Sequence, residues 1–228
     1  MKTIEERKNK DSFYELINYN KECIKEKDWI LERGANWKYF LRNLAIGKEE
    51  PVESSGGGDP LKNVASCYTS LLDVGCHDCS ITREFNIQHK VGVDAFEKIK
   101  LLAEQHCEFN CMDARDISKK FESKSFDVVC ELDFIEHLET IEEANKLMSD
   151  MEAIAKRLII HVCPTDVIEC ENFTSDAYGN MEGFDKKRDF NELQHHLLQP
   201  TKDYFLDKGY KVRLYGGDLK KIIAWKYL

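Results

Sequence analysis

The chain of 228 residues has the size of one ordinary domain, and 42% of its residues are hydrophobic, enough to form a large core. Its formal net charge is −9 and its basic residues form only short, scattered clusters, so a nucleic acid duplex is an unfavourable partner. The longest apolar run, Ile222–Trp225, has four residues, whereas a membrane span needs roughly 18. The first residues are charged and contain no apolar signal core, so we expect a cytoplasmic protein without a membrane span.

Residues 1–48 are predicted to form an N-terminal helical arm. Apolar residues at near-helical spacing predict one helix from about Asp11 to Gly34 and a second from Asn36 to about Ile46. The aromatic residues of this arm suit a lid over a pocket, or equally an arm packed on the body. Residues 49–60 contain three consecutive glycines and two prolines, which predicts a flexible linker before the main domain at 61–228.

The main domain alternates apolar runs with helical patterns. Strands are predicted at 70–74, 90–93, 107–111, 126–132, 157–163, 210–215 and 221–226, and helices at 81–85, 96–105, 141–155 and 202–208. This alternation predicts an α/β fold with a doubly wound, mostly parallel, seven-stranded sheet. The last two strands are joined by a turn too short for a crossover, so we expect an antiparallel C-terminal hairpin.

The nine cysteines do not suggest a disulfide framework. Four of them lie in or beside strand-like runs and are predicted to be small buried hydrophobes: Cys107, Cys111, Cys130 and Cys163.

Acidic residues stand at the ends of the first four predicted strands. The first strand ends as Asp73-Val74-Gly75-Cys76, where a glycine allows a sharp turn whose backbone N–H groups can face a polar ligand. Asp94 ends the second strand, 21 residues after Asp73, close to the spacing expected for a carboxylate that binds ribose hydroxyls. Asp113-Ala114 follows the third strand, and Glu131-Leu132-Asp133 ends the fourth.

From about Leu71 onward, this ordered set resembles the class I S-adenosylmethionine-dependent methyltransferase superfamily, with a domain of the type 11/12 kind. The resemblance implies that S-adenosylmethionine is the cofactor and that the last strand is inserted antiparallel in the sheet. It also implies the cofactor-binding residues: Asp73, Gly75, Cys76 and His77 at the methionine part, Asp94 at the ribose, Asp113 and Ala114 at the adenine, and Glu131 and Leu132 near the sulfonium.

The loop departs from the family pattern at His77 and Cys79, where the family usually has glycines that allow a positive φ or a close backbone approach. The departure leaves open a loop with weakened binding or a protein that no longer catalyses. Cys76 and Cys79 also form a C-x-x-C pair, but a zinc site needs a second pair of ligands, and the sequence contains no other C-x-x-C. Metal or redox use of the pair is therefore the less favoured interpretation.

His137 and His196 are the candidate catalytic residues. His137 follows the fourth strand, where a methyl acceptor should lie, and an imidazole can remove a proton near neutral pH. Alternatively, His137 only orients the following helix. The spacing of Asp133, Glu136 and His137, with the later His196, also resembles metal-dependent branches of the superfamily, such as small-RNA 2′-O-methyltransferases. Mg²⁺ is possible but not favoured, because it prefers oxygen ligands, and no metal ligand is assigned.

We therefore predict an enzyme that transfers a methyl group from S-adenosylmethionine to oxygen or nitrogen of a small molecule. The polar segment 172–199 and the arm are expected to form the acceptor pocket. A non-catalytic binding module and a metal-dependent RNA 2′-O-methyltransferase are the alternatives, although the charge makes nucleic acid an unlikely partner. Membrane partners are not expected, and the chain is expected to be a monomer or a homodimer.

Overall fold

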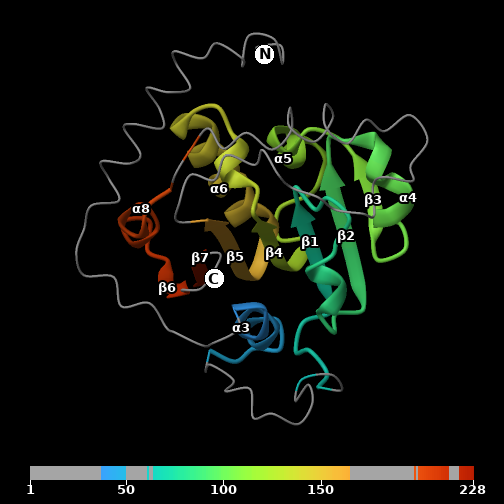
Figure 1. The fold of residues 1–228 in the computed structure, drawn as a ribbon, viewed down its shortest axis with the longest axis horizontal. Coiled ribbons are helices and arrows are strands. Elements are labelled where there is room, and N and C mark those ends of the chain that lie inside the picture. Colours follow the sequence, from blue (N-terminus) through green and yellow to red (C-terminus); the bar gives the residue numbers. More distant parts are fainter. Residues whose placement is uncertain (1–36, 50–60, 62–63, 165–197, 199, 216–220) are drawn as a thin grey trace.

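The computed structural model describes residues 37–49, 61, 64–164, 198, 200–215 and 221–228. These residues form one seven-stranded sheet with the order β3-β2-β1-β4-β5-β7-β6 (Figure 1). Strands β1 to β5 pair in parallel, and β7 lies antiparallel between β5 and β6. The predicted doubly wound, mostly parallel sheet and its antiparallel hairpin are confirmed.

The predicted strands match the observed ones closely. The strands are β1 (Ser70–Val74), β2 (His89–Asp94), β3 (Glu108–Cys111), β4 (Phe126–Leu132), β5 (Ala155–Pro164), β6 (Lys211–Tyr215) and β7 (Lys221–Tyr227). In β4 and β5 nearly every residue is buried, because helices cover both faces of a parallel sheet and its central strands are mostly apolar. That burial is why their short apolar runs were readable in the sequence.

The helices α5 (Ile117–Lys120), α6 (Ile141–Ile154) and α8 (Lys202–Leu206) contribute to the core on one face of the sheet. Helix α6 begins at the N-cap Thr140, whose side chain accepts a hydrogen bond from the backbone N–H of Glu143. Its buried residues recur every three or four positions: Ala144, Leu147, Met148, Met151 and Ile154. This apolar stripe fixes the helix on the sheet.

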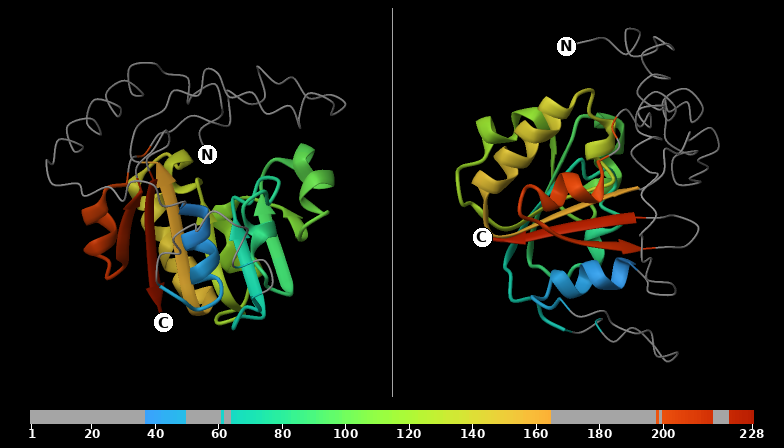
Figure 2. Two further views of the ribbon diagram at one scale, coloured as in Figure 1. Left: turned by 60° about the horizontal axis from the view of Figure 1, so that its bottom comes forward. Right: turned by 90° about the vertical axis from the view of Figure 1, so that its left-hand side faces the viewer.

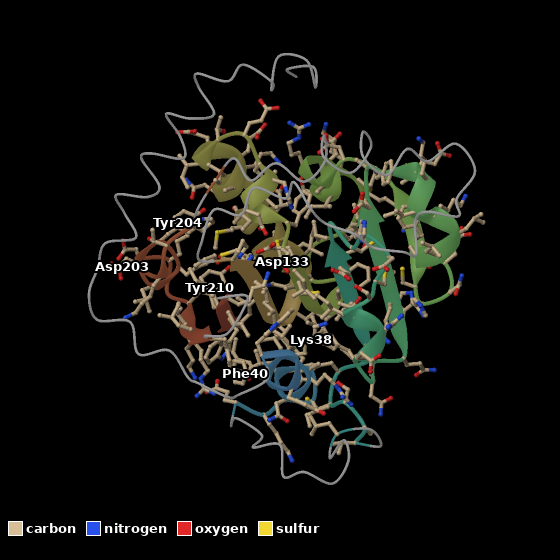
Figure 3. All side chains as sticks on the ribbon, in the orientation of Figure 1. Lys38, Phe40, Asp133, Asp203, Tyr204 and Tyr210 are labelled. Carbon is tan, nitrogen blue, oxygen red and sulfur yellow. The ribbon has the colours of Figure 1, made fainter. Side chains whose placement is uncertain are left out.

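Helix α3 (Trp37–Leu44) covers the opposite face, so the sheet lies between α3 and α6 (Figure 2). Figure 3 shows Phe40 on this helix. The Phe40 ring lies 5.1 Å from the ring of Trp225 and 5.9 Å from that of Tyr215, measured between centroids. This part of the predicted arm therefore packs on the body. The predicted helix at 11–34 and most of the predicted linker lie outside the described residues.

Other expectations about the elements need correction. The predicted helix at 81–85 is only the 3₁₀ turn η1 (Thr82–Glu84), and that at 96–105 is the 3₁₀ turn η2 (Glu97–Ile99) followed by α4 (Lys100–Ala103). The 3₁₀ turns η3 (Ala114–Asp116) and η4 (Ile135–His137) and the helix α5 were not predicted. Cys130 and Cys163 are buried as expected, but Cys107 is only partly buried and Cys111 is exposed because β3 is an edge strand. No helix among the described residues is long and apolar enough to cross a membrane.

Candidate functional site

The predicted acids lie at or just after the carboxyl ends of neighbouring strands. In the register, Asp73 stands beside Gly92, and Val74 stands beside Glu131. Asp94 stands beside Cys111, two residues before Asp113. The sheet order reverses between β1 and β4, and ligands of open α/β sheets bind where the order reverses, outside the carboxyl ends of the strands. The site is therefore expected at the ends of β1, β2 and β4.

Gly75 makes the turn after β1 possible. Its φ is +71°, and a Cβ built on it would lie 2.2 Å from Cδ2 of Phe134. The ring of Phe134, in the loop after β4, thus packs directly against the backbone of the β1 loop. A side chain at this position would meet both backbone strain and a steric clash.

His77 and Cys79 replace glycines of the family pattern, yet they keep a glycine-like backbone. Their φ angles are +48° and +57°. The left-handed conformation costs an L-residue about 1–2 kcal/mol, so this loop carries strain that glycines would avoid. Both residues therefore adopt the positive φ that a glycine adopts without strain.

Three backbone N–H groups of the β1 loop already have partners within the protein. Those of Gly75 and Cys76 donate to the carbonyl of Val93, at 2.8 and 3.0 Å. That of His77 donates to Oδ2 of Asp94 at 3.0 Å. These three donors hold the loop on β2, so the expectation that they face a ligand is corrected.

Asp94 retains the capacity to bind two hydroxyls. Its Oδ1 accepts from the N–H of Phe96 at 2.8 Å, and its Oδ2 accepts from His77. An ionised carboxylate can accept about four hydrogen bonds, so about one acceptor position remains on each oxygen. Burial raises the pKa of Asp94, while the hydrogen bonds to the backbone N–H groups of Phe96 and His77 favour its charged form. The side chain stays partly accessible, as a ribose ligand requires.

Asp73 is buried and binds the segment that follows the β1 loop. It is only 3% exposed, and Oδ2 accepts from the hydroxyl of Thr82 at 2.6 Å. Cys130 Sγ lies 3.7 Å from Oδ1. Burial raises the pKa of Asp73 to about 7. The side chain offers almost no surface to a cofactor, so its position differs from the direct contact that the resemblance implied.

Asp113 caps the turn η3 and is held by Arg115. Its carboxylate accepts from the N–H of Arg115 and from the Arg115 guanidinium, with Nη2 at 2.5 Å from Oδ2. The same guanidinium reaches Glu143 Oε1 of α6 at 2.9 Å. Ala114 is buried beside it. Asp113 is thus fixed at the end of β3 through a contact to the helix layer.

Glu131 is fully buried, beside Leu132, which is nearly so. Oε2 of Glu131 accepts from the N–H groups of Phe134 and Ile135, and Oε1 lies 3.0 Å from Nδ1 of His161. Burial raises the pKa of Glu131 well above its ordinary value and lowers that of His161 to about 3. Both shifts favour the uncharged forms of the two side chains, and the hydrogen bonds that Oε2 of Glu131 accepts hold the loop after β4. His161 is fully buried in the core, and the register of β4 and β5 places it beside Glu131.

The pattern of Asp133, Glu136 and His137 does not form a ligand cluster. Asp133 pairs with Lys221, at 2.5 Å between Oδ1 and Nζ. Glu136 is buried, and neither of its carboxyl oxygens has a hydrogen-bond partner among the described residues. Within the part of the chain that the structure describes, three metal-ligating side chains converge only at Cys76, Cys79 and Cys107. His137 ends η4, and His196 lies outside the described residues. The N–H of Leu198 donates to the carbonyl of Glu136 at 3.0 Å.

A cavity of about 250 Å³ lies between α3 and the segment after the β1 loop. It is lined by Lys38, Tyr39, Arg42, Ser80, Ile81, Arg83, Glu84 and Phe85. None of these is a predicted site residue. The strand-end geometry, and not this cavity, therefore defines the candidate site.

Comparisons with known proteins concern the family and the fold of the chain. Residues 72–157 match the family profile described as a methyltransferase domain. The N-methyltransferase NodS from Bradyrhizobium japonicum, solved with S-adenosyl-L-homocysteine, has 11% identity and a TM-score of 0.51, over 93% of this chain and 97% of that one. This similarity shows a shared fold.

Two further solved structures have lower scores. A methyltransferase from Archaeoglobus fulgidus, described as dependent on S-adenosylmethionine, has 17% identity and a TM-score of 0.46, over 69% of this chain and 86% of that one. Magnesium protoporphyrin IX methyltransferase from Synechocystis, with bound S-adenosylmethionine, has 17% identity and a TM-score of 0.43, over 69% of this chain and 68% of that one. No curated protein matches the sequence. Residues 72–157 are therefore similar to a methyltransferase domain, and the chain shares the fold of NodS.

Proposed function

We propose that this protein transfers a methyl group from S-adenosylmethionine to an oxygen or nitrogen atom of a small molecule in the cytoplasm. The observation that carries the proposal is the carboxylate of Asp94, which keeps about one acceptor position on each oxygen beside the point where the sheet order reverses. Two vicinal hydroxyls of a ribose suit this arrangement. The fold shared with NodS supports the same reaction class.

The residues around Asp94 are suited to hold the rest of the cofactor. Gly75 and Phe134 shape the loop beside the methionine part, Cys76 and His77 follow in the same loop, and Asp113 and Ala114 bound the adenine side. Asp73 and Glu131 act as supports, because their side chains are buried and bonded to the loops that they hold. The bound cofactor supplies an electrophilic methyl group on a sulfonium.

The protein's further task is to place the acceptor and remove its proton. We assign proton removal to His137, which lies at the end of η4 beside the β4 strand end. His196 and the segment 172–199 are proposed to complete the acceptor pocket. An acceptor held in line with the methyl group needs little other catalysis, because positioning alone lowers the barrier.

The proposal is tested by replacing Asp94. Asp94→Ala should weaken binding of S-adenosylhomocysteine by about 10- to 100-fold, because each lost hydrogen bond to a charged acceptor is worth about 1.5–3 kcal/mol. Isothermal titration calorimetry measures this. The matched control is Asp116→Ala, which removes an acid whose described partner is the exposed Lys119. Unchanged affinity in folded Asp94→Ala would exclude the ribose assignment.

His137 is tested separately from binding. His137→Ala should lower turnover by about 100-fold or more while leaving the affinity for S-adenosylhomocysteine unchanged, because general-base catalysis typically contributes that much. Turnover is measured with labelled cofactor and a metabolite extract, with and without EDTA. Intact turnover at saturating cofactor would show that positioning suffices without this base.

A non-catalytic binding module is the second candidate, favoured by the side chains of His77 and Cys79 in the loop and by the N–H groups that the loop uses internally. It predicts a folded wild-type protein that does not bind S-adenosylhomocysteine. The RNA 2′-O-methyltransferase alternative predicts instead methyl transfer to RNA that EDTA abolishes.

A further inference from the structure

We propose that Cys76, Cys79 and Cys107 bind a divalent cation of the Zn²⁺ class beneath the 75–79 loop. The three sulfur atoms all lie within 4.8 Å of one another, and those of Cys79 and Cys107 are 3.0 Å apart. In a tetrahedral site with Zn–S bonds of about 2.3 Å, the sulfurs are about 3.8 Å apart. Small side-chain movements therefore convert the observed cluster into a coordination site.

The site joins two segments that lie far apart in the sequence. Cys76 and Cys79 belong to the β1 loop, where the N–H of Cys79 closes a turn onto the carbonyl of Cys76 at 2.8 Å. Cys107 comes from the turn between α4 and β3, where its N–H donates to the carbonyl of Ala103 at 3.0 Å. The fold thus supplies the third ligand that the C-x-x-C pair lacks in the sequence.

The neighbouring strand leaves room for the cluster. A Cβ built on Gly92 of β2 would lie 2.7 Å from the sulfur of Cys76 and 2.8 Å from that of Cys107. Gly92 has no positive φ in the structure, so its backbone conformation does not require glycine. The absence of a side chain at Gly92 instead leaves room for two of the three sulfurs, those of Cys76 and Cys107.

Burial and charge also suit a cation. Cys76 and Cys79 are 6% and 1% exposed, whereas Cys107 is only partly buried and leaves a route for the ion and a fourth, solvent-derived ligand. Binding of a divalent cation would release three thiol protons to solvent and leave a net charge of −1, with no oxidation or reduction.

Cation binding explains more of the geometry than a disulfide would. A disulfide would join two of the sulfurs and leave no role for the third. A cation uses all three, and it ties the strained backbone at His77 and Cys79 to the turn before β3. The site does not depend on the proposed methyl transfer, because it would hold the loop whether or not a cofactor binds.

The experiment uses the full chain, reduced with a phosphine and freed of metal by chelation. Titration with Cd²⁺ should produce thiolate-to-metal charge-transfer absorbance that saturates at one equivalent, and Zn²⁺ should displace the Cd²⁺. Cys107→Ser should lower the affinity by about 100-fold or more, and Cys79→Ser should do the same. The control is Cys111→Ser, which changes an exposed cysteine close to Cys107 in the sequence and should titrate like the wild type.

A second measurement does not depend on a variant that folds. Zn²⁺ should raise the unfolding temperature of the reduced wild-type chain, because an ion that binds only the folded state stabilises it. The proposal is overturned if the reduced wild type takes up no ion, or if folded Cys107→Ser binds Cd²⁺ as tightly as the wild type. It is also overturned if the protein as purified has a Cys79–Cys107 disulfide and binds no ion after reduction.

Discussion

At Gly75, backbone conformation and packing exclude every other residue. The φ of +71° alone would permit a strained side chain, as His77 and Cys79 show with φ angles of +48° and +57°. The difference is space, because a Cβ at Gly75 would lie 2.2 Å from the ring of Phe134. One position of the loop thus requires glycine, and two others accept side chains.

Substitutions at Gly75 and Gly209 separate the cost of a positive φ from the cost of a steric clash. Gly75→Ala should lower the free energy of unfolding by about 3 kcal/mol or more, because overpacking adds to the cost of a positive φ. The control is Gly209→Ala, where φ is +79° but no atom lies within 4 Å of the added Cβ. It should cost only about 1–2 kcal/mol. Urea denaturation measures both, and equal losses would show that Phe134 moves aside freely.

Burial of Asp73 makes the free energy of unfolding depend on pH, with a sign opposite to that of an acid in a surface ion pair. Burial raises the pKa of Asp73 from 3.8 to about 7 in the folded chain. Between these values the unfolded chain has lost a proton that the folded chain keeps, so the folded state binds more protons. The contribution of Asp73 to stability therefore falls as the pH rises from about 4 to 7, and it is constant above that.

Asp73→Asn should remove this penalty while keeping an oxygen that accepts from Thr82. Relative to the wild type, the variant should gain on the order of a few kcal/mol between pH 4 and pH 8, since each pKa unit corresponds to about 1.4 kcal/mol. Unfolding in urea at several pH values measures the gain. Asp116→Asn, a partly exposed acid, provides the baseline, and a constant difference between Asp73→Asn and wild type would contradict the prediction.

At the scale of elements, the sequence predicted strands better than helices. The ranges of β1 and β4 were predicted to the residue, because a buried parallel strand is a short apolar run with little else it can form. The segments at 81–85 and 96–105 have apolar residues at helical spacing, but only one or two turns form. Local periodicity does not show how much of such a segment the rest of the protein covers.

The cysteine cluster shows a second limit. The spacing of Cys76 and Cys79 was visible in the sequence, but the third sulfur depends on the alignment of the turn before β3 with the β1 loop. That alignment follows from the pairing of β2 with both β1 and β3, with Gly92 in the middle. The pairing of Glu131 with His161 depends in the same way on the register of β4 and β5. Contacts set by register between strands cannot be read from spacing along one chain.

At the scale of the whole molecule, the sheet order decides where the site lies. The acids were predicted to converge because each ends a parallel strand, and β1, β2 and β4 are neighbours in the sheet. The sequence did not show that Asp73 and Glu131 would be buried as supports while Asp94 keeps accessible oxygens. That distinction depends on which loop covers each strand end, and therefore on the assembled fold.

The last prediction concerns the coupling of cofactor binding to the stability of the whole domain. A ligand that binds only the folded state adds about 2.7 kcal/mol at 100 times its Kd, which for a chain of this length raises the unfolding temperature by about 5–10 °C. S-adenosylhomocysteine should produce this shift in the wild type and in His137→Ala. The same concentration should produce a much smaller shift in Asp94→Ala, because less of that variant is bound. Differential scanning calorimetry measures all three, and an equal shift in Asp94→Ala would place the ligand away from the end of β2.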